Sequence, residues 1–252
     1  MTRPDPSDPP VAPVRATSDQ TRVGEAIRTP RAAAVAGIAF SVLFAVAVIL
    51  VRTAVPPDPA DAEQLLTDPA QRDAVTFALD LVPFAGIAFL WFVGVLRARF
   101  GEAEDRFFAT AFLGSGLLFV AMLFVTAALA AGLVDNAGTH GSDLVDSGSW
   151  AVGQRVTEEL MNLYTMRMAA VFTLAGSTIL FRTGLAPRWL VLTGFLAGML
   201  ILVTVSFFHW IALAFPLWVL GVSVYILIAG LRRAPDRGPG ARDASSSGRS
   251  AA

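Results

Sequence analysis

The stretch Leu160–Phe181, LMNLYTMRMAAVFTLAGSTILF, decides the fold class of this chain. Its length and apolar content are those of a helix that crosses a membrane. It also contains Arg167, and a charge at the centre of a membrane helix costs roughly 2.5–3.5 kcal/mol on insertion scales. Such a charge faces water or has a partner, so we expect an acidic partner on a second span.

The composition of the whole chain indicates a membrane protein. Of its 252 residues 55% are hydrophobic and 15% are charged, whereas soluble domains have about 45–50% apolar and about 25% charged residues. All 19 basic residues are arginine, cysteine is absent, and the net charge is −1. The absence of cysteine excludes disulfides and thiolate metal sites, and the charge argues against a nucleic-acid partner. The preference for arginine, alanine and glycine is typical of a GC-rich bacterial genome.

Long apolar runs predict an all-α fold, a polytopic integral membrane bundle of about six transmembrane helices. The first four spans are predicted at 32–51, 75–96, 107–134 and 160–181. The last two share the apolar block Trp189–Leu231, which is about 60 Å of helix and must turn back on itself. We place this turn at Phe208-His209-Trp210, where a polar side chain adjoins an interface-seeking tryptophan.

The two ends of the chain differ from this apolar middle. Residues 1–31 and 232–252 lack apolar runs, so we predict two disordered tails around a six-helix transmembrane domain at 32–231. Arginines gather in these tails and in the connections that follow the second and fourth spans. The positive-inside rule therefore predicts that both the N-terminus and the C-terminus are cytoplasmic. The outer connections, 53–74 and 135–157, are predicted loops.

Asp80, in the second span, is the predicted partner of Arg167. Both residues lie about 10 Å inside the outer ends of their spans, and both side chains lean outward. Projection at about 100° per residue gives the fourth span a polar stripe that flanks Arg167 and comprises Glu159, Asn162, Thr173 and Ser177. The opposite, lipid-facing side is predicted to hold Met161, Met168, Phe172, Ala175 and Ile179.

The resulting intramembrane polar cluster has two interpretations. Its members are Asp80, Glu159, Asn162, Arg167 and His209, the last from the predicted outer turn. In the first interpretation an internal salt bridge fixes the order of the helices. In the second, the cluster lines an outward-facing pocket for a small ligand, ion or proton. We favour the first, because the inner halves of the spans offer only hydroxyl side chains, too few for a transport pathway.

Weaker patterns concern helix packing and chemistry. Gly194 and Gly198 form a GxxxG motif, and small residues recur from Ala33 at every fourth position of the first span. Both patterns predict close helix packing, within this chain or in a dimer. His140 and His209 lack the spacing of a metal or haem site, and no catalytic or nucleotide-binding motif occurs. We therefore predict no enzyme activity, no cofactor and no metal.

Two segments carry a resemblance to a known family. They are YTMRMAAVFTLAGSTILFRTGLAPRWLVLTGF at 164–195 and FPLWVLGVSVYILIAG at 215–230. With their MRM, RTG and PRWL elements they resemble a family of actinobacterial multi-pass membrane proteins of unknown function. The resemblance extends over about Val75 to Gly230. It implies a plasma-membrane protein without an assigned activity, and it singles out Arg167 and Arg182 for mutation.

Three functional hypotheses follow. The preferred one is a non-enzymatic structural or accessory integral membrane protein. The second is a small-molecule or ion transporter or sensor with an outward-facing pocket around Asp80, Glu159 and Arg167. The third is an intramembrane enzyme that acts on lipid, for which no acid–base or metal constellation is evident. The lipid bilayer is the expected partner, with a second copy or another membrane protein as further candidates, and the identity of any small ligand stays open.

Overall fold

The computed structural model describes residues 30–54, 68–100, 106–204 and 209–232, and in these ranges the chain is helical and contains no strand. The predicted all-α fold is thereby confirmed. The predicted tails lie outside the described residues, apart from Pro30, Arg31 and Arg232 at the ends of the first and last helices.

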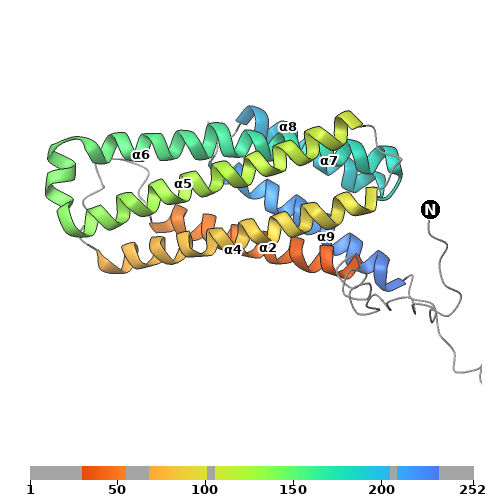
Figure 1. The fold of residues 1–252 in the computed structure, drawn as a ribbon, viewed down its shortest axis with the longest axis horizontal. Coiled ribbons are helices and arrows are strands. Elements are labelled where there is room, and N and C mark those ends of the chain that lie inside the picture. The colour runs from red at the N-terminus through yellow and green to blue at the C-terminus, as the bar shows by residue number, and fades with distance from the viewer. Residues whose placement is uncertain (1–29, 55–67, 101–105, 205–208, 233–252) are drawn as a thin grey trace, which may run out of the picture.

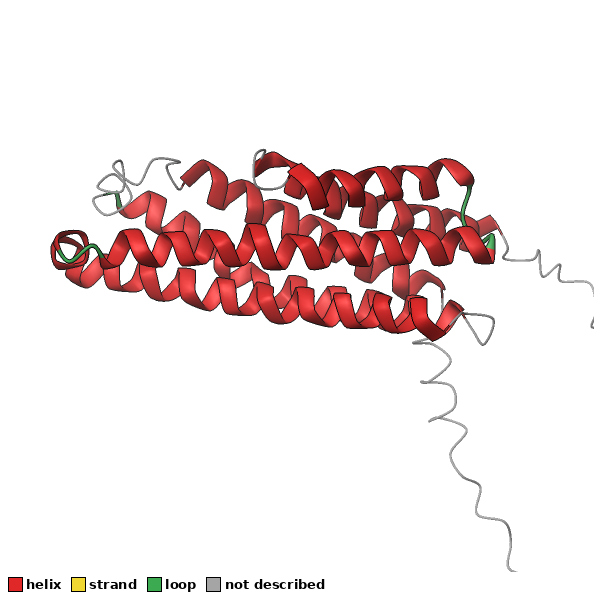
Figure 2. Ribbon diagram, turned by 90° about the horizontal axis from the view of Figure 1, so that it is seen from above, coloured by secondary structure: helices red, strands yellow, loops and turns green. Residues whose placement is uncertain are grey.

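The helices run roughly along one long axis (Figure 1), and in the part of the chain that the structure describes almost all residues are helical (Figure 2). Their bounds are α2 (Pro30–Ala54), α4 (Pro69–Phe100), α5 (Arg106–Asp146), α6 (Ser149–Glu159), a π-helical segment (Leu160–Thr165), α7 (Met166–Thr183), α8 (Arg188–Thr204), a 3-10 helix (His209–Leu213) and α9 (Ala214–Arg232). From Ser149 to Thr183 the chain is one continuous helical rod, in which the π-helical segment joins α6 to α7.

Five of these helical stretches are long and apolar enough to cross a membrane. They are Ala32–Thr53, Pro69–Arg97, Phe107–Ala137, Ser149–Thr183 and Trp210–Ala229. Helix α8, with 17 residues, is apolar but shorter than these. Helices are therefore present at all six predicted positions, five of them have the length of a membrane span, and a sixth crossing by α8 stays a prediction.

A cluster of phenylalanines fills the centre of the bundle. Helix α2 packs on α4 and α9, α5 packs on α4 and α7, and α8 lies against α7 and α9. The fully buried phenylalanines at the centre of this arrangement are Phe40, Phe44, Phe89, Phe92, Phe112, Phe119, Phe172 and Phe215. Phe89 has ring neighbours on four other helices, among them Phe40 at 4.7 Å and Phe172 at 5.0 Å between centroids. Five helices thus converge on one aromatic core.

Small residues bring the helices close together within the chain. Gly194 faces Ser177 and Trp218, and Gly198 faces Ala170 and Leu174, so the GxxxG motif of α8 packs against α7 and α9. In α2, Gly37 lies directly against Ser223 and Phe92. These glycines of both small-residue patterns therefore pack inside this chain, and a role of the patterns in a dimer stays a prediction.

Most buried hydroxyl groups bond to their own helices rather than across the bundle, whereas Ser177 Oγ has no hydrogen-bond partner in the described structure. Ser41 donates to the Gly37 carbonyl at 2.7 Å, Thr173 to Ala169 at 2.8 Å, and Ser223 to Val219 at 2.7 Å. Bonds of this kind satisfy a hydroxyl without a partner on another helix. The interior is therefore held by apolar packing and not by a chain of polar side chains.

The prediction of a loop at 135–157 was wrong. Helix α5 continues to Asp146, and after a short turn α6 begins at Ser149. Pairing stabilises this helical hairpin: Gly153 packs against Leu133, and Trp150 is buried with Ala137 and Val75. This burial outweighs the low helix propensity of the Gly-, Asp- and Ser-rich sequence.

The connection between the last two helices agrees in position with the prediction. The chain leaves α8 after Thr204 and re-enters an α-helix at Ala214, and the 3-10 helix between them contains Trp210. Phe208 lies outside the described residues. Close contacts pair Leu190 with Gly221 and Gly194 with Trp218, so α8 and α9 are antiparallel.

Candidate functional site

Asp80 lies on the face of α4 that is turned away from the other helices of the aromatic core. It is nine residues from Phe89, about 180° around the helix, so it points away from the aromatic core. Its side chain is exposed. The same face carries the exposed apolar side chains of Phe77, Phe84, Ile87 and Trp91. Asp80 is therefore an acidic residue on an otherwise apolar outer stripe.

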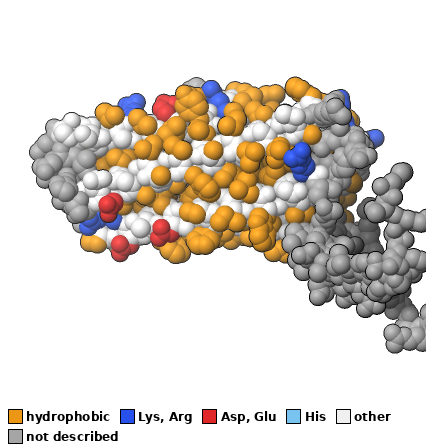
Figure 3. Space-filling view, in the orientation of Figure 1, with side chains coloured by type: hydrophobic (Ala, Val, Ile, Leu, Met, Phe, Trp, Pro, Cys, Tyr) orange, Lys and Arg blue, Asp and Glu red, His pale blue; other side chains and the backbone are white. Residues whose placement is uncertain are grey.

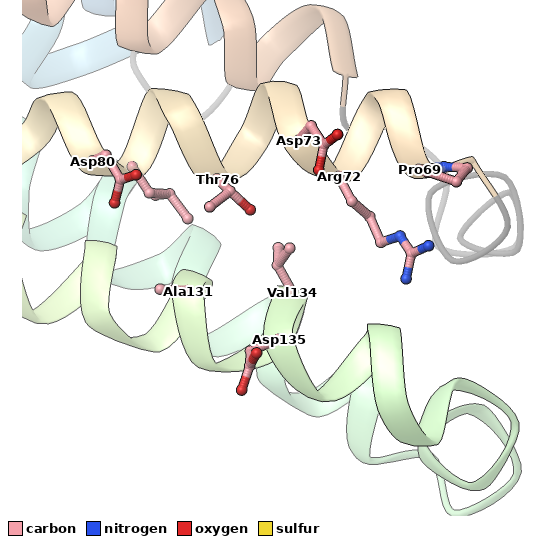
Figure 4. A pocket seen from close by; sticks show the side chains of 9 residues that line it. Pro69, Arg72, Asp73, Thr76, Asp80, Ala131, Val134 and Asp135 are labelled. Carbon is pink, nitrogen blue, oxygen red and sulfur yellow. The ribbon is translucent and has the colours of Figure 1, made fainter.

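Asp80 lines an open groove between α4 and α5 (Figure 4). The groove has a volume of about 450 Å³ and is lined by Pro69, Arg72, Asp73, Thr76, Leu79, Asp80, Ala131, Val134 and Asp135. The Arg72 side chain extends toward the Pro69 end, away from Asp80. The groove presents three carboxylates and one guanidinium, so it suits a small polar ligand with cationic character.

Arg167 is exposed on α7, and the structure does not bring it together with Asp80 inside the chain. Neither residue makes a hydrogen bond or an ion pair with another residue in the described ranges. The two charges lie on different helices that pack against opposite sides of α5. The internal salt bridge expected from the sequence is thus not formed in this structure.

The π-helical segment Leu160–Thr165 explains why the predicted stripe of the fourth span differs from the observed one. The Met166 N–H donates to the Met161 carbonyl, and the Thr165 hydroxyl donates to the Leu160 carbonyl at 2.8 Å. Such i→i+5 bonding adds residues to a turn, so a projection at 100° per residue loses its phase here. Residues before and after the segment do not share the face that a regular α-helix would give them.

The sequence predicted a polar face of α7 turned into the bundle and an opposite face turned to lipid, and only the first agrees with the burial of the side chains. Thr173 and Ser177 are buried, as expected for a polar face turned into the bundle. Phe172, Ala175 and Ile179, placed on the lipid side by projection, are also buried. The lipid-facing assignment was therefore wrong, because α7 is surrounded by α5, α8 and α9.

A polar network that the sequence did not reveal joins α2 to the π-helical segment. Nη2 of Arg52 donates to Oδ1 of Asn162 over 3.5 Å. The Glu158 carboxylate is close enough to attract the Arg52 charge, and it accepts a 3.2 Å hydrogen bond from the buried Gln154. The i, i+4 spacing of Gln154 and Glu158 is the one signal in the sequence that could have indicated part of it.

The remaining predicted residues take separate positions. Asn162 is partly buried and belongs to the Arg52 network. Glu159 is exposed at the end of α6. His209 begins the 3-10 helix, and its side chain lies outside what the structure describes. The four predicted residues whose side chains the structure describes, Asp80, Glu159, Asn162 and Arg167, are therefore distributed over several surfaces and do not form one pocket.

Charged side chains lie at the two edges of an apolar belt, with Asp80 and Arg167 at one edge and Arg97 and Arg182 at the other. On α4 the distance along the helix from Asp80 to Arg97 is about 25 Å, and on α7 the distance from Arg167 to Arg182 is about 22 Å. On the face drawn in Figure 3, apolar side chains cover the middle, and most charged side chains lie toward the ends. A belt of this height approaches the hydrocarbon thickness of a bilayer, about 30 Å.

The described residues contain no group of three or more His, Asp or Glu side chains that could hold a metal ion. No protein-family model, curated protein or solved structure matches the chain.

Proposed function

We propose that this chain is a multi-pass integral membrane protein that crosses the bilayer six times and acts as a structural or accessory component rather than an enzyme. The apolar belt between Asp80 and Arg97 is the observation that carries the proposal. Exposed apolar side chains such as Phe84 and Trp91 cover this belt and suit contact with lipid.

The sixth crossing is α8. Its 17 residues extend over about 25 Å, which equals the height of the belt. It runs antiparallel to α9, as a crossing between two outer-to-inner helices must. Its exposed stripe contains Trp189, Leu192 and Leu196, and the hydroxyl of the exposed Thr193 beside them donates to the Leu190 carbonyl at 2.9 Å, so lipid can cover the stripe.

The arginine distribution supports the orientation. Arg97, Arg182 and Arg188 lie at the end of the belt where α2 begins at Pro30 and α9 ends at Arg232 (Figure 1), and the sequence beyond both of these residues is rich in arginine. With that end in the cytoplasm, the hairpin of α5 and α6 projects outward from the plasma membrane. The resemblance to actinobacterial multi-pass membrane proteins fits this placement, and the paired helices provide a rigid outer surface for contact with other proteins.

The aromatic core supports the structural role over transport. Phe89, Phe119 and Phe215 pack with centroids 5.0–5.8 Å apart at the centre of the bundle. A transport route through the helices would have to displace these rings. The second candidate, an outward-facing sensor, rests on the groove at Asp80 alone, since Glu159 and Arg167 lie elsewhere.

Cysteine accessibility tests the proposal directly, because the natural chain has no cysteine. Ser147→Cys at the outer turn and Leu185→Cys between α7 and α8 are both exposed positions. In intact cells a membrane-impermeant maleimide should label residue 147 and should label residue 185 only after the membrane is opened. Labelling of residue 185 in sealed cells would overturn the topology.

Thermal shift separates the structural role from the sensor. A panel of small organic cations is added to purified wild-type protein and to Asp80→Asn. Stabilisation of the wild type that is lost in Asp80→Asn would favour the sensor, and no shift in either protein would favour the structural role.

A further inference from the structure

Helix α5 is the least covered of the candidate spans. Only 22% of its apolar window is buried inside the chain, the lowest share among the five. Leu117, Leu118, Val125 and Leu129 are all exposed along it. In Figure 1 it crosses one face of the molecule between α4 and the α6–α7 rod, and it packs on α4 and α7. This face of α5 is apolar, and no other described helix covers it.

Opposite charges border this face on its two sides. Asp80 lines the groove that α4 forms with Ala131 and Val134 of α5. On α7, the Arg182 guanidinium lies 4.7 Å from the centre of the Phe108 ring of α5. Arg167 is 15 residues before Arg182, about 60° around the helix, so it projects from the same flank. Asp80 and Arg167 are both exposed, and neither makes a hydrogen bond or an ion pair with another described residue.

The two charges also lie at similar depth. The contact between Phe89 and Phe172 places these rings at one level. Asp80 is nine residues outward from Phe89, and Arg167 is five residues outward from Phe172, which leaves a difference of about 6 Å along the axis. An arginine side chain that leans toward its helix N-terminus, here outward, has the length to cover this difference.

We propose that a second copy of this chain docks on the α5 face, so that Asp80 pairs with the partner's Arg167 and Arg167 pairs with the partner's Asp80. A two-fold axis along the membrane normal keeps depth unchanged and makes both pairs at once. Each pair neutralises a charge that otherwise lies unpaired at the edge of the apolar belt. The proposal rests on the membrane insertion proposed above.

Complementary charge reversal tests the contact. Asp80→Arg alone would set arginine against the partner's Arg167, and Arg167→Asp alone would set aspartate against the partner's Asp80. We expect each variant, carried by both of two differently tagged copies, to lower mutual capture in mild detergent about tenfold. Mixing the two variants recreates two opposite-charge pairs, and capture should return to the wild-type level.

The mixing arm distinguishes this contact from a salt bridge within one chain, which both variants would break and which mixing could not restore. Arg155→Asp is the control: it reverses a charge at an exposed position of α6 that belongs to neither proposed pair, and it should leave capture unchanged. Wild-type copies that fail to capture each other, or single reversals that capture normally, would overturn the proposal. Maleimide labelling at residue 147 on the same membranes reports insertion separately, so a monomer that is correctly inserted is told apart from a chain that never entered the bilayer.

Discussion

Two regions of this molecule are held together by different forces. One is the apolar belt, and the other is the outer extension, formed by the hairpin of α5 and α6 beyond the belt together with the first turns of α4. In the belt, rings from five helices interlock and most buried hydroxyls bond to their own backbone; Ser177 Oγ is the one polar atom of the belt that is buried without a partner in the described structure. In the outer extension, a small cluster of Val75, Ala137 and Trp150 joins three helices, and Gln71 Oε1 and Trp150 Nε1 are buried without a partner in the described structure. Buried polar atoms without partners lower stability. The comparison teaches that the outer extension should open before the belt does.

Removal of Phe89 should have the largest effect. Phe89→Ala leaves a cavity among rings from four other helices, so we expect a loss of about 3–5 kcal/mol in the free energy of unfolding. Phe84→Ala on the same helix is the control, because Phe84 is 63% exposed and its truncation leaves no cavity. Thermal unfolding in detergent measures both. Equal effects at the two positions would show that the phenylalanine cluster is not the core of the belt.

Trp150→Ala should destabilise the outer extension and leave the belt intact. We expect a loss of about 3 kcal/mol that is confined to the tip of α5 and to α6. Hydrogen exchange should speed up there, while the amides around Phe172 keep their protection. Val152→Ala, on an exposed position of α6, is the control. Faster exchange throughout the bundle would mean that the two regions unfold as one unit.

Gly194→Ala should overpack the belt. A methyl group at this position would collide with Ser177 and Trp218, and we expect a loss of about 1–3 kcal/mol. Gly94→Ala is the matched control: nothing lies within 4 Å of its added carbon, and alanine favours the helix by up to about 1 kcal/mol. Unfolding temperatures that move in opposite directions would support the prediction, and a Gly194→Ala protein as stable as the wild type would contradict it.

The Arg52–Asn162 contact should contribute least. The hydrogen bond is long and partly exposed to solvent, so a double-mutant cycle with Arg52→Ala and Asn162→Ala should give a coupling of about 0.5–1.5 kcal/mol. The same cycle with Arg72→Ala in place of Arg52→Ala should give none. A coupling as large as the effect of Phe89→Ala would reverse the comparison and make the polar network the main support of the outer edge.

Local patterns in the sequence predicted most of the belt. Apolar runs placed the spans, the interruption after Thr204 fell near the expected turn, and the spacing of Gly194 and Gly198 predicted close packing. Each of these signals is contained within one helix length, so it does not depend on tertiary structure. The aromatic core was not predicted, because phenylalanine suits lipid and protein interior equally well.

The outer region was harder to predict, for physical reasons. The hairpin from Asp135 to Thr157 has the composition of a loop, and only its pairing makes it helical. Arg52 and Asn162 are 110 positions apart, and no local pattern links them. The expected salt bridge between Asp80 and Arg167 was predicted from the similar depth of the two residues and from the direction in which their side chains lean. The salt bridge does not form, because the two side chains project from their helices toward different sides.

The π-helical segment also has a mechanical consequence. The helical rod from Ser149 to Thr183 links the outer hairpin to the centre of the belt. Its six-residue π-helical segment, Leu160–Thr165, sets the rotation of α6 relative to α7. Deletion of one residue in this segment would restore regular α-helical hydrogen bonding in the rod and would turn α6 by about 100° relative to α7. Torque on α6 therefore reaches Phe172 along the rod through this segment, whereas the α5 arm of the hairpin reaches Phe172 directly, through the stacked ring of Phe112 at 4.4 Å.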